Sequence, residues 1–360
     1  MVLHDGGFHH RCLRFLSFRG VPWSEDSLLA LQLDLSQNYI WHLNEIGKVM
    51  SSYDLIPDIH GQTDKLTSIL TTLGYFHKNG SWRHSDADRK CIFLGDYIDR
   101  GAGNRSVLGI VRGMVEEGSA QAIMGNHELN AIHYHTMNPD TGVPLRAWSK
   151  KNNDQHASFL DEFPVGSKET FEQISWMQTL PLFLELDDFR VVHACWNSES
   201  IEFLNENTNS GVLSGDQFVF AADPNSEFKN HVDITAKGPE VNLPGGATFN
   251  DKQGAKRSEI RVKWWNSVAN TWADLSMSVP DPSELPTSPL PSTLRGMIYP
   301  SKSKPVFFGH YWLTGSPKLQ AHNVLCLDYS AGKDGPLMAY TFEAGSKALN
   351  LAQLSSTASS

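Results

Sequence analysis

The sequence has little positive charge, few cysteines and no long apolar run. Among its 360 residues, 40 acidic side chains outnumber 30 basic ones, which gives a formal net charge of −10 at pH 7. A chain with this balance has no general positive field to hold the backbone of a nucleic-acid duplex. We therefore expect any polyanionic substrate to be bound locally, by metal ions and a few arginines.

The scarcity of cysteine and of apolar runs also bears on location. Cys12, Cys91, Cys195 and Cys326 are far apart and form no Cys-x-x-Cys pair, so they indicate no disulfide framework. No apolar run reaches the roughly 18 to 20 residues of a membrane span. Polar residues interrupt the apolar stretches of residues 1–30 before a secretory core can form. We expect a cytoplasmic protein without membrane partners.

The chain divides into an unpatterned start and a patterned body. Residues 1–49 have no counterpart in the motifs described below, which begin just after Met50. Two explanations stay open: translation starts at Met50, or residues 1–49 are an extension whose leucines between 28 and 33 form a short amphipathic helix. We expect residues 50–345 to form the catalytic domain and residues 346–360 to be a disordered tail.

Short apolar runs alternate with amphipathic stretches in the first part of the body. Residues 66–73 carry leucine and isoleucine at helical spacing and precede Gly74, which predicts a helix that ends there. The runs 91–94 and 121–124 predict strands, and residues 107–115 carry a second helical pattern between them. This alternation indicates an α/β fold.

The later part of the body is less regular. Residues 135–168 are polar and show no clear period, whereas 182–186 and 189–192 predict a hairpin. Residues 211–293 are rich in turns, glycine and proline. We interpret this last segment as a cap or insertion beside a functional cleft.

Metal-ligand residues stand at the ends of several short apolar runs. These residues are Asp58, His60, Asp96, Asn126, His193 and His310. A strand that ends in a polar turn projects side chains into the crevice at the edge of its sheet. Carboxylate, imidazole and amide donors together suit Mn²⁺, Fe or Zn²⁺. The sequence therefore predicts a two-metal site where these strand ends converge.

The run from Gly95 to Gly101 adds further polar groups to this set. It contains Asp99, a second carboxylate, and Arg100, whose guanidinium can bind two phosphate oxygens at once. Glycines at both ends allow the backbone to bend close to the site. This composition favours a phosphate-ester substrate.

Other interpretations of neighbouring residues are weaker. His127-Glu128 begins like a zinc-protease motif, but Ala131 stands where that motif requires a second histidine. Cys195 is not expected to act, because thiolate ligands favour softer metals than this donor set. His133 and His135 are interpreted as ordinary helix or surface residues. None of these is included among the expected ligands.

The order of the motifs resembles the calcineurin-like metallophosphoesterases, and within them the phosphoprotein phosphatase family. That family carries DxHG, GDxxDRG, GNHE and two later histidines, and residues 58–61, 95–101 and 125–128 with His193 and His310 match in the same order. The resemblance spans roughly residues 53–342. Many relatives outside this family have a second histidine where the chain has Trp312, which favours the phosphoprotein phosphatase branch. Pro57 departs from the glycine that relatives often carry there.

The resemblance implies a four-layer α-β-β-α sandwich, with two mixed sheets flanked by helices. It implies an enzyme with two divalent metal ions that hydrolyses phosphomonoesters through attack by a hydroxide shared between the metals. We expect phosphorylated proteins as substrates, as for bacterial serine/threonine phosphatases. The alternative is a dinucleoside polyphosphate, because residues 327–337 resemble the end of symmetrical diadenosine tetraphosphatases. A catalytically inactive metal-binding scaffold is disfavoured, since every motif position is filled.

The resemblance also assigns roles to single residues. One metal would take Asp58, His60 and Asp96, and the other would take Asp96, Asn126, His193 and His310. His127 is the expected general acid, and Asp99 orients its imidazole. Arg100 and Asn126 would contact the phosphoryl oxygens.

The family usually supplies a second phosphate-binding arginine between its last two histidines. Arg257, Arg261 and Arg295 lie in that interval. We select Arg261, in a strand-like run where it shares a face with Lys263; a solvated strand face is the alternative. The adjacent Trp264-Trp265 pair would either stack on a substrate or pack in the core.

Overall fold

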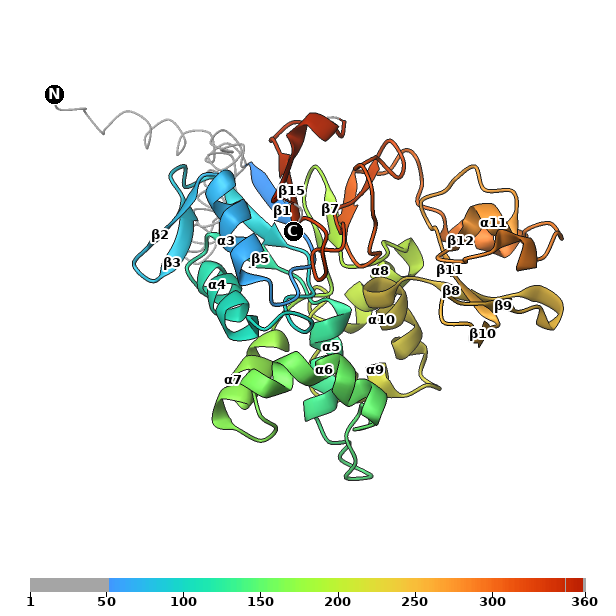
Figure 1. Ribbon diagram of the computed structural model, residues 1–360, viewed down its shortest axis with the longest axis horizontal. Helices are drawn as coiled ribbons and strands as arrows, with labels where there is room; N and C mark the ends of the chain where they lie inside the picture. Colours follow the sequence, from blue (N-terminus) through green and yellow to red (C-terminus); the bar gives the residue numbers. More distant parts are fainter. Residues whose placement is uncertain (1–51, 347, 359–360) are drawn as a thin grey trace, which may run out of the picture. The chain divides into compact units, whose positions relative to one another are not determined.

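The computed structural model describes residues 52–346 and 348–358 (Figure 1). The proposed N-terminal extension, 1–49, and the alternative start at Met50 lie outside these residues. Within the described ranges, no helix is long and apolar enough to cross a membrane.

Two mixed sheets form the centre of the fold. The first has the strand order β16-β15-β1-β4-β5, and the second has the order β14-β13-β7-β6. The strands are β1 (Tyr53–Ile56), β4 (Lys90–Phe93), β5 (Ala120–Ala122), β15 (Met338–Phe342) and β16 (Leu354–Ser356), then β6 (Phe183–Glu185), β7 (Arg190–Val192), β13 (Val306–Phe308) and β14 (Val324–Cys326). In each sheet three strands are parallel, so their carboxyl ends meet at one edge.

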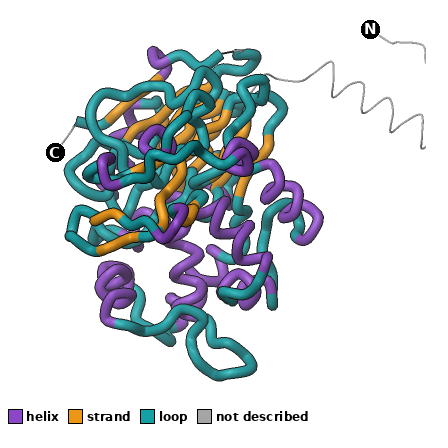
Figure 2. Tube along the Cα trace, turned by 90° about the vertical axis from the view of Figure 1, so that its right-hand side faces the viewer, coloured by secondary structure: helices purple, strands orange, loops and turns teal. Residues whose placement is uncertain are grey.

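Alternation along the strands separates two buried clusters. Leu55 of β1 and Ile92 of β4 belong to one cluster, together with Phe307 of β13 and Phe189, which precedes β7. The apolar residues next to them in the same strands belong to the other cluster, which includes residues of the helices. This is the two-residue period of a strand that is covered on both faces. Figure 2 shows the strands gathered together with helices beside them.

Helices cover the outer face of the first sheet. They are α3 (Thr63–Thr72) and α4 (Asn104–Glu116). The apolar stripe of α3 includes Leu66 and Ile69, both buried, and Gly74 follows the helix with φ +90°. The predicted helix with a glycine stop is therefore confirmed.

Helices and part of the cap cover the second sheet. The helices α8 (Ser198–Asn207) and α10 (Glu227–Lys237) lie on the opposite side from α3 and α4 (Figure 1). The N–H of Ala194, just after β7, donates to Thr235 O of α10 at 3.1 Å. Trp264 packs on Phe308 at a ring-centroid distance of 4.8 Å. The four-layer α/β sandwich is thereby confirmed.

The two segments that the sequence presents as irregular contain regular elements. Residues 135–168 include α6 (Lys150–Glu162), which follows α5 (Asn126–His135) and precedes α7 (Lys168–Met177). Residues 211–293 include α9 (Gln217–Ala222), α10, α11 (Trp272–Leu275), β9 (Phe249–Asn250), β10 (Lys256–Arg257) and a small sheet of β8 (Glu240–Asn242), β11 (Glu259–Val262) and β12 (Ser276–Met277). A hairpin of β2 (Tyr75–Lys78) and β3 (Ser81–His84) follows α3. Polar composition hides α6, because only His156 and Phe159 of its residues are buried.

The structure contradicts the predicted disordered tail. Strand β16 pairs with β15, with Leu354 opposite Tyr340 and Ser356 opposite Met338. The N–H of Thr357 also donates to Leu337 O at 2.9 Å. These are backbone interactions, which a polar sequence such as Leu-Ser-Ser can make without an apolar pattern.

We predict that deletion of residues 354–360 lowers the free energy of unfolding by about 2 kcal/mol, because it removes an edge strand and its backbone hydrogen bonds. Denaturant unfolding of the full chain, this deletion and a control that lacks only residues 359–360 measures the difference. Equal stability of all three proteins would contradict the pairing of β16.

Candidate metal centre

The predicted ligand residues follow the carboxyl ends of strands from both sheets. Asp58 and His60 come after β1, Asp96 after β4, Asn126 opens α5 after β5, His193 follows β7 and His310 follows β13. All except Asn126 are buried, and Asp58 and His193 are fully so. The structure thus brings together residues that are up to 252 positions apart in the chain, as with Asp58 and His310.

Asp96 belongs to two groups of side chains that could each hold a metal ion. One group is His60, Asp96 and His127, and the other is Asp96, His193 and His310; within each group the candidate ligand atoms lie within 4.8 Å of one another. Asp96 Oδ2 lies 3.6 Å from His60 Nε2, and Oδ1 lies 3.3 Å from His193 Nε2. Each carboxylate oxygen therefore faces a different group.

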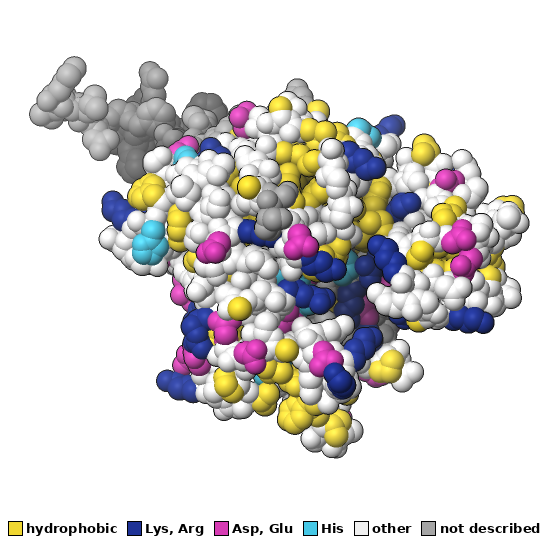
Figure 3. Space-filling model, in the orientation of Figure 1, with side chains coloured by type: hydrophobic (Ala, Val, Ile, Leu, Met, Phe, Trp, Pro, Cys, Tyr) yellow, Lys and Arg dark blue, Asp and Glu magenta, His cyan; other side chains and the backbone are white. Residues whose placement is uncertain are grey.

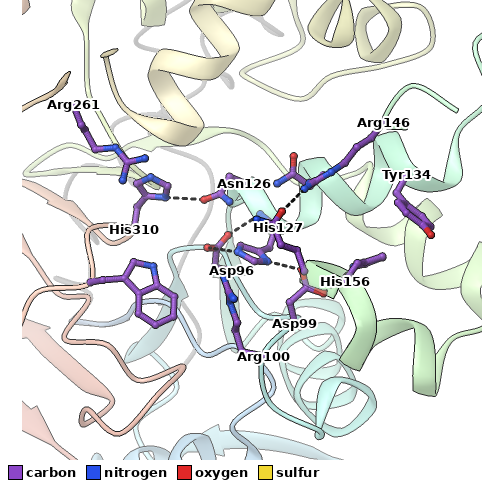
Figure 4. A pocket seen from close by; sticks show the side chains of 13 residues that line it. Asp96, Asp99, Arg100, Asn126, His127, Tyr134, Arg146, His156, Arg261 and His310 are labelled. Carbon is purple, nitrogen blue, oxygen red and sulfur yellow. Dashed lines mark hydrogen bonds and ion pairs between the residues drawn. The ribbon is translucent and has the colours of Figure 1, made fainter. Parts of the chain in front are cut away.

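Asn126 lies beside the second group of candidate ligands, Asp96, His193 and His310. Its Oδ1 is 2.7 Å from His310 Nδ1 and 3.1 Å from His193 Nε2. Figure 4 shows the amide between His310 and His127, with Asp96 below it. The amide oxygen is accordingly placed as a neutral donor beside two imidazoles.

Asp58 lies next to the backbone of His310, which follows β13, but it belongs to neither group of candidate metal ligands. Its carboxylate accepts the backbone N–H of His310 at 2.9 and 3.1 Å. Burial raises the pKa of Asp58 well above its ordinary value, and Asp328 adds to the rise. A Cβ at Gly309 would lie 1.9 Å from Asp58 Oδ2, so the glycine allows this close approach.

The donor atoms fit bound cations. Within the described part of the chain, His60 Nε2 and His310 Nε2 are buried and have no hydrogen-bond partner. Burial lowers the pKa of His60 to about 4, and nearby His127 contributes, so its imidazole is neutral, as a ligand must be. Its other nitrogen lies 3.0 Å from Ile98 O, which orients Nε2 toward Asp96.

The backbone around the centre is held in unusual conformations. His60, Asp96 and His310 have φ of +52°, +54° and +72°. A Cβ at Gly95 would lie 2.5 Å from Gly125 N, and one at Gly125 would lie 2.3 Å from Asp96 Oδ1. Left-handed non-glycine residues cluster where surrounding contacts enforce them, often at functional sites.

Glu128 ties two of these loops together. Its Oε2 accepts the N–H groups of Asp96 at 2.8 Å and Gly125 at 3.0 Å, and its Oε1 accepts that of Tyr97 at 2.8 Å. The side chain is fully buried. Sequence reasoning assigned it no role, although its place in Gly-Asn-His-Glu was visible.

His127 begins a chain of hydrogen bonds that leads away from the centre. Its Nδ1 lies 2.5 Å from Asp99 Oδ2, and Asp99 Oδ1 lies 2.8 Å from His156 Nδ1. His156 Nε2 is 3.3 Å from His135 Nε2. His156 was missed, because no sequence motif marks it, whereas His135 is the last residue of α5, as its interpretation as a helix residue allows.

These contacts shift the pKa values of the pair. Burial lowers the pKa of His127, but the Asp96 and Asp99 carboxylates outweigh it and raise the value. Burial raises the pKa of Asp99, but its bonds to His127 and His156 bring the value down to about 2. The arrangement favours a protonated imidazole beside an ionised carboxylate.

A cleft of about 240 Å³ opens over these residues. Its walls include Arg100, Arg146 and Arg261 together with Asp96, Asn126 and His127. Figure 3 shows basic side chains gathered around a hollow in which histidine is visible. A chain with net charge −10 thus has a basic cleft.

Among the three arginines considered from the sequence, the structure brings Arg261 to the cleft. Its Nη2 lies 3.3 Å from Glu240 Oε1. Arg257 instead pairs with Asp251 at 2.7 Å, and Arg295 lines a separate cavity. Arg146, in a segment without a readable motif, was missed.

The remaining candidates belong to the core. Trp264 and Trp265 are buried, and Trp264 Nε1 donates to Ala194 O at 2.9 Å, so the packing interpretation of this pair is confirmed. Cys195 is buried, and burial raises the pKa of its thiol well above the ordinary value. A thiol in that state is a poor nucleophile.

An α/β sandwich whose strand ends share carboxylate and imidazole donors is typical of metal-dependent hydrolases. The chain belongs to the calcineurin-like phosphoesterases, because the model of that family matches residues 53–310. Members of this family are named phosphoesterases, that is, enzymes that hydrolyse phosphoric esters. The resemblance to this family that the motifs indicate is confirmed.

Two known proteins are similar to part of this chain. The asymmetrical bis(5'-nucleosyl)-tetraphosphatase PrpE of Bacillus subtilis (strain 168) is 30% identical over 175 residues, which are 46% of this chain and 66% of that protein. The protein of the same name from Oceanobacillus iheyensis is 31% identical over 165 residues, or 45% and 64% of the two chains. The chain thus spans just under two thirds of the length of these relatives. These relatives are named asymmetrical tetraphosphatases. Residues 327–337, in contrast, resemble the end of the symmetrical enzymes.

The fold of the chain is only loosely similar to those of solved structures. A serine/threonine phosphatase from Saccharomyces cerevisiae with similarity to human phosphatase PP5 is 14% identical, and the match covers 86% of this chain and 79% of that one with a TM-score of 0.47. A score below 0.5 supports no argument about function. The family assignment depends on the sequence match.

We predict that Glu128→Ala lowers the free energy of unfolding by about 2–4 kcal/mol, because three buried N–H groups lose their acceptor. Glu128→Gln, which keeps one acceptor oxygen, is expected to cost less. Denaturant unfolding of both variants at one fixed Mn²⁺ concentration measures the effect. Wild-type stability of Glu128→Ala would show that the three bonds do not support the loops.

Proposed function

We propose that the chain hydrolyses dinucleoside polyphosphates such as diadenosine tetraphosphate. The observation that carries this proposal is its similarity to enzymes named bis(5'-nucleosyl)-tetraphosphatases. The basic cleft supports it, since such substrates carry several negative charges. This proposal reverses the order that the motifs alone suggest, in which a phosphorylated protein comes first.

The proposed metal ligands are those expected from the motifs. Asp58, His60 and Asp96 would hold one divalent ion, and Asp96, Asn126, His193 and His310 the other. When bound, two such ions activate water and neutralise charge on the phosphoryl oxygens. The nitrogen and oxygen donors suit Mn²⁺, Fe or Zn²⁺, and the orphaned nitrogens of His60 and His310 support occupancy by cations.

The chain's own residues supply the proton and the orientation of substrate. We infer that His127 protonates the leaving oxygen, because it lines the cleft and Asp99 keeps its imidazole charged. Arg100 and Arg261 line the same cleft and are proposed to bind the phosphoryl oxygens, with Asn126 beside them.

We predict that Mn²⁺-supported initial rates are measurable on diadenosine tetraphosphate and at background on a phosphothreonine peptide. Asp96→Asn protein gives the background rate. Chromatography of the products distinguishes cleavage into AMP and ATP from cleavage into two ADP molecules. Turnover of the peptide alone would replace the proposed substrate with phosphorylated proteins.

We also predict that Asp96→Asn and His127→Asn fail in different ways. Asp96→Asn is expected to lose metal, because this carboxylate belongs to both proposed sets of metal ligands, whereas His127 belongs to neither. His127→Asn is expected to retain metal and to lower kcat by about 10²–10⁴-fold, the usual contribution of general acid catalysis. Metal analysis of the purified variants and steady-state kinetics measure the two effects, and equal metal loss in both would refute the separate roles.

A further inference from the structure

Arg146 lines the cleft, but the proposed function assigns it no role in binding or catalysis. It lies in the segment between α5 and α6, and it lines the same cavity as Arg100, Arg261 and His127. Figure 4 shows Arg146 and Arg261 reaching in from opposite sides, with His127 between them. The guanidinium of Arg146 therefore faces the cleft from the wall away from His310.

Hydrogen bonds hold Arg146 in this position. Its Nη2 donates to Gln155 Oε1 at 2.7 Å and to Asn152 Oδ1 at 3.2 Å, both on α6. Its own backbone N–H donates to His133 O of α5 at 3.0 Å. The side chain is thus held by α6 and the backbone by α5, which reduces the entropy lost when the guanidinium binds a ligand.

The hydrogen-bond partners of Arg146 are neutral, unlike those of several other arginines. Arg89, Arg112, Arg190 and Arg261 each lie within salt-bridge distance of a carboxylate. In the described ranges no carboxylate lies that close to Arg146. Burial lowers the pKa of Arg146 from its ordinary value, and the charge of Asp99 opposes part of that change.

A partly buried guanidinium with neutral acceptors retains donors for an anion. The cleft already supplies Arg100 and Arg261 for the phosphoryl group that is attacked. A second anionic group that is covalently linked to the first would reach the opposite wall of the same cavity. A substrate with consecutive phosphoryl groups has this chemistry, whereas a phosphomonoester does not.

We propose that Arg146 binds a second phosphoryl group, adjacent to the one at the metal centre, and so selects polyphosphate substrates over monoesters. This inference rests on the proposed function and names the subsite that would serve it. Gln155 and Asn152 act as positioning residues, because their side-chain oxygens accept hydrogen bonds from the guanidinium.

The test compares two substrates in two variants. Arg146→Met is expected to raise KM for diadenosine tetraphosphate by about 10–100-fold, the effect of one charge-assisted hydrogen bond or more. Its kcat/KM for p-nitrophenyl phosphate is expected to stay within about threefold of wild type, because that substrate has one phosphoryl group. Arg112→Met, which removes a surface charge paired with Glu116 on α4, is the matched control and is expected to change neither value.

Gln155→Glu supplies an independent variant of nearly the same shape. Its carboxylate would stand 2.7 Å from the guanidinium, where the amide oxygen now lies, and would compete with the phosphate. We expect it to raise KM for the tetraphosphate in the same direction, while Arg146→Lys retains part of the affinity. An equal loss on both substrates would assign Arg146 a structural role, and unchanged KM would exclude phosphate binding.

A competition experiment separates this proposal from the proposed function. If wild-type protein does not cleave diadenosine tetraphosphate, the proposed function fails, but inhibition of p-nitrophenyl phosphate hydrolysis still probes the subsite. With free Mn²⁺ buffered at a saturating level, tripolyphosphate should inhibit wild type at least about tenfold more strongly than Arg146→Met. Orthophosphate should inhibit both equally. Equal inhibition by tripolyphosphate would overturn the subsite.

Discussion

The Asp96 residue connects most of the centre. Its carbonyl oxygen accepts the N–H groups of Ile59 and His60, both at 2.9 Å, so the loop after β1 is bonded to the loop after β4. Its carboxylate accepts the N–H of His127 at 2.9 Å, which fixes the start of α5. The positions of three loops thus depend on one residue held in a left-handed conformation. That residue is also the one shared by both donor groups.

The electrostatics of this arrangement favour cations. Asp58, Asp96, Glu128 and Asp328 are all buried near one another. Burial raises the pKa of Glu128 to about 7 and that of Asp328 to about 6, with Asp96 adding to both. Buried carboxylates are costly unless they are paired or coordinate metals. Divalent ions at the centre would stabilise the ionised forms, so the fold and the inferred cofactors are consistent.

The convergence of these side chains could be predicted from the sequence, because the candidate ligands stand in motifs at strand ends. Asp96 and His310 could be selected because each ends an apolar run. The carboxyl ends of parallel strands meet at one edge of a sheet, which predicts that such residues lie close together. His156 and Arg146 carry no such mark. They reach the cleft through the packing of α6 on α5, which depends on tertiary contacts far from any motif. Strand β16 was missed for a related reason, since its pairing is made by backbone groups.

This difference separates two kinds of residue in the cleft. The motif residues lie on loops that follow strands of the two sheets, and in the proposed function they carry out the cleavage of the phosphoester. Arg146 lies on the α5–α6 side, and its place depends on side chains such as Gln155. Changes on that side can alter the substrate without disturbing the ligands. A family model built on shared motifs therefore identifies the reaction but leaves the substrate to residues outside them.

The charge of the chain is consistent with this local recognition. At physiological ionic strength, exposed charges more than about 8 Å apart are largely screened, so the net charge of −10 does not prevent a polyanion from approaching. Guanidinium groups inside a cleft are screened less, and their donors bind phosphoryl oxygens directly. In the proposed function, affinity for a polyphosphate would depend on Arg100, Arg146 and Arg261, which line the cleft, rather than on the surface as a whole. A few fixed side chains can thus give an acidic protein a polyanionic substrate.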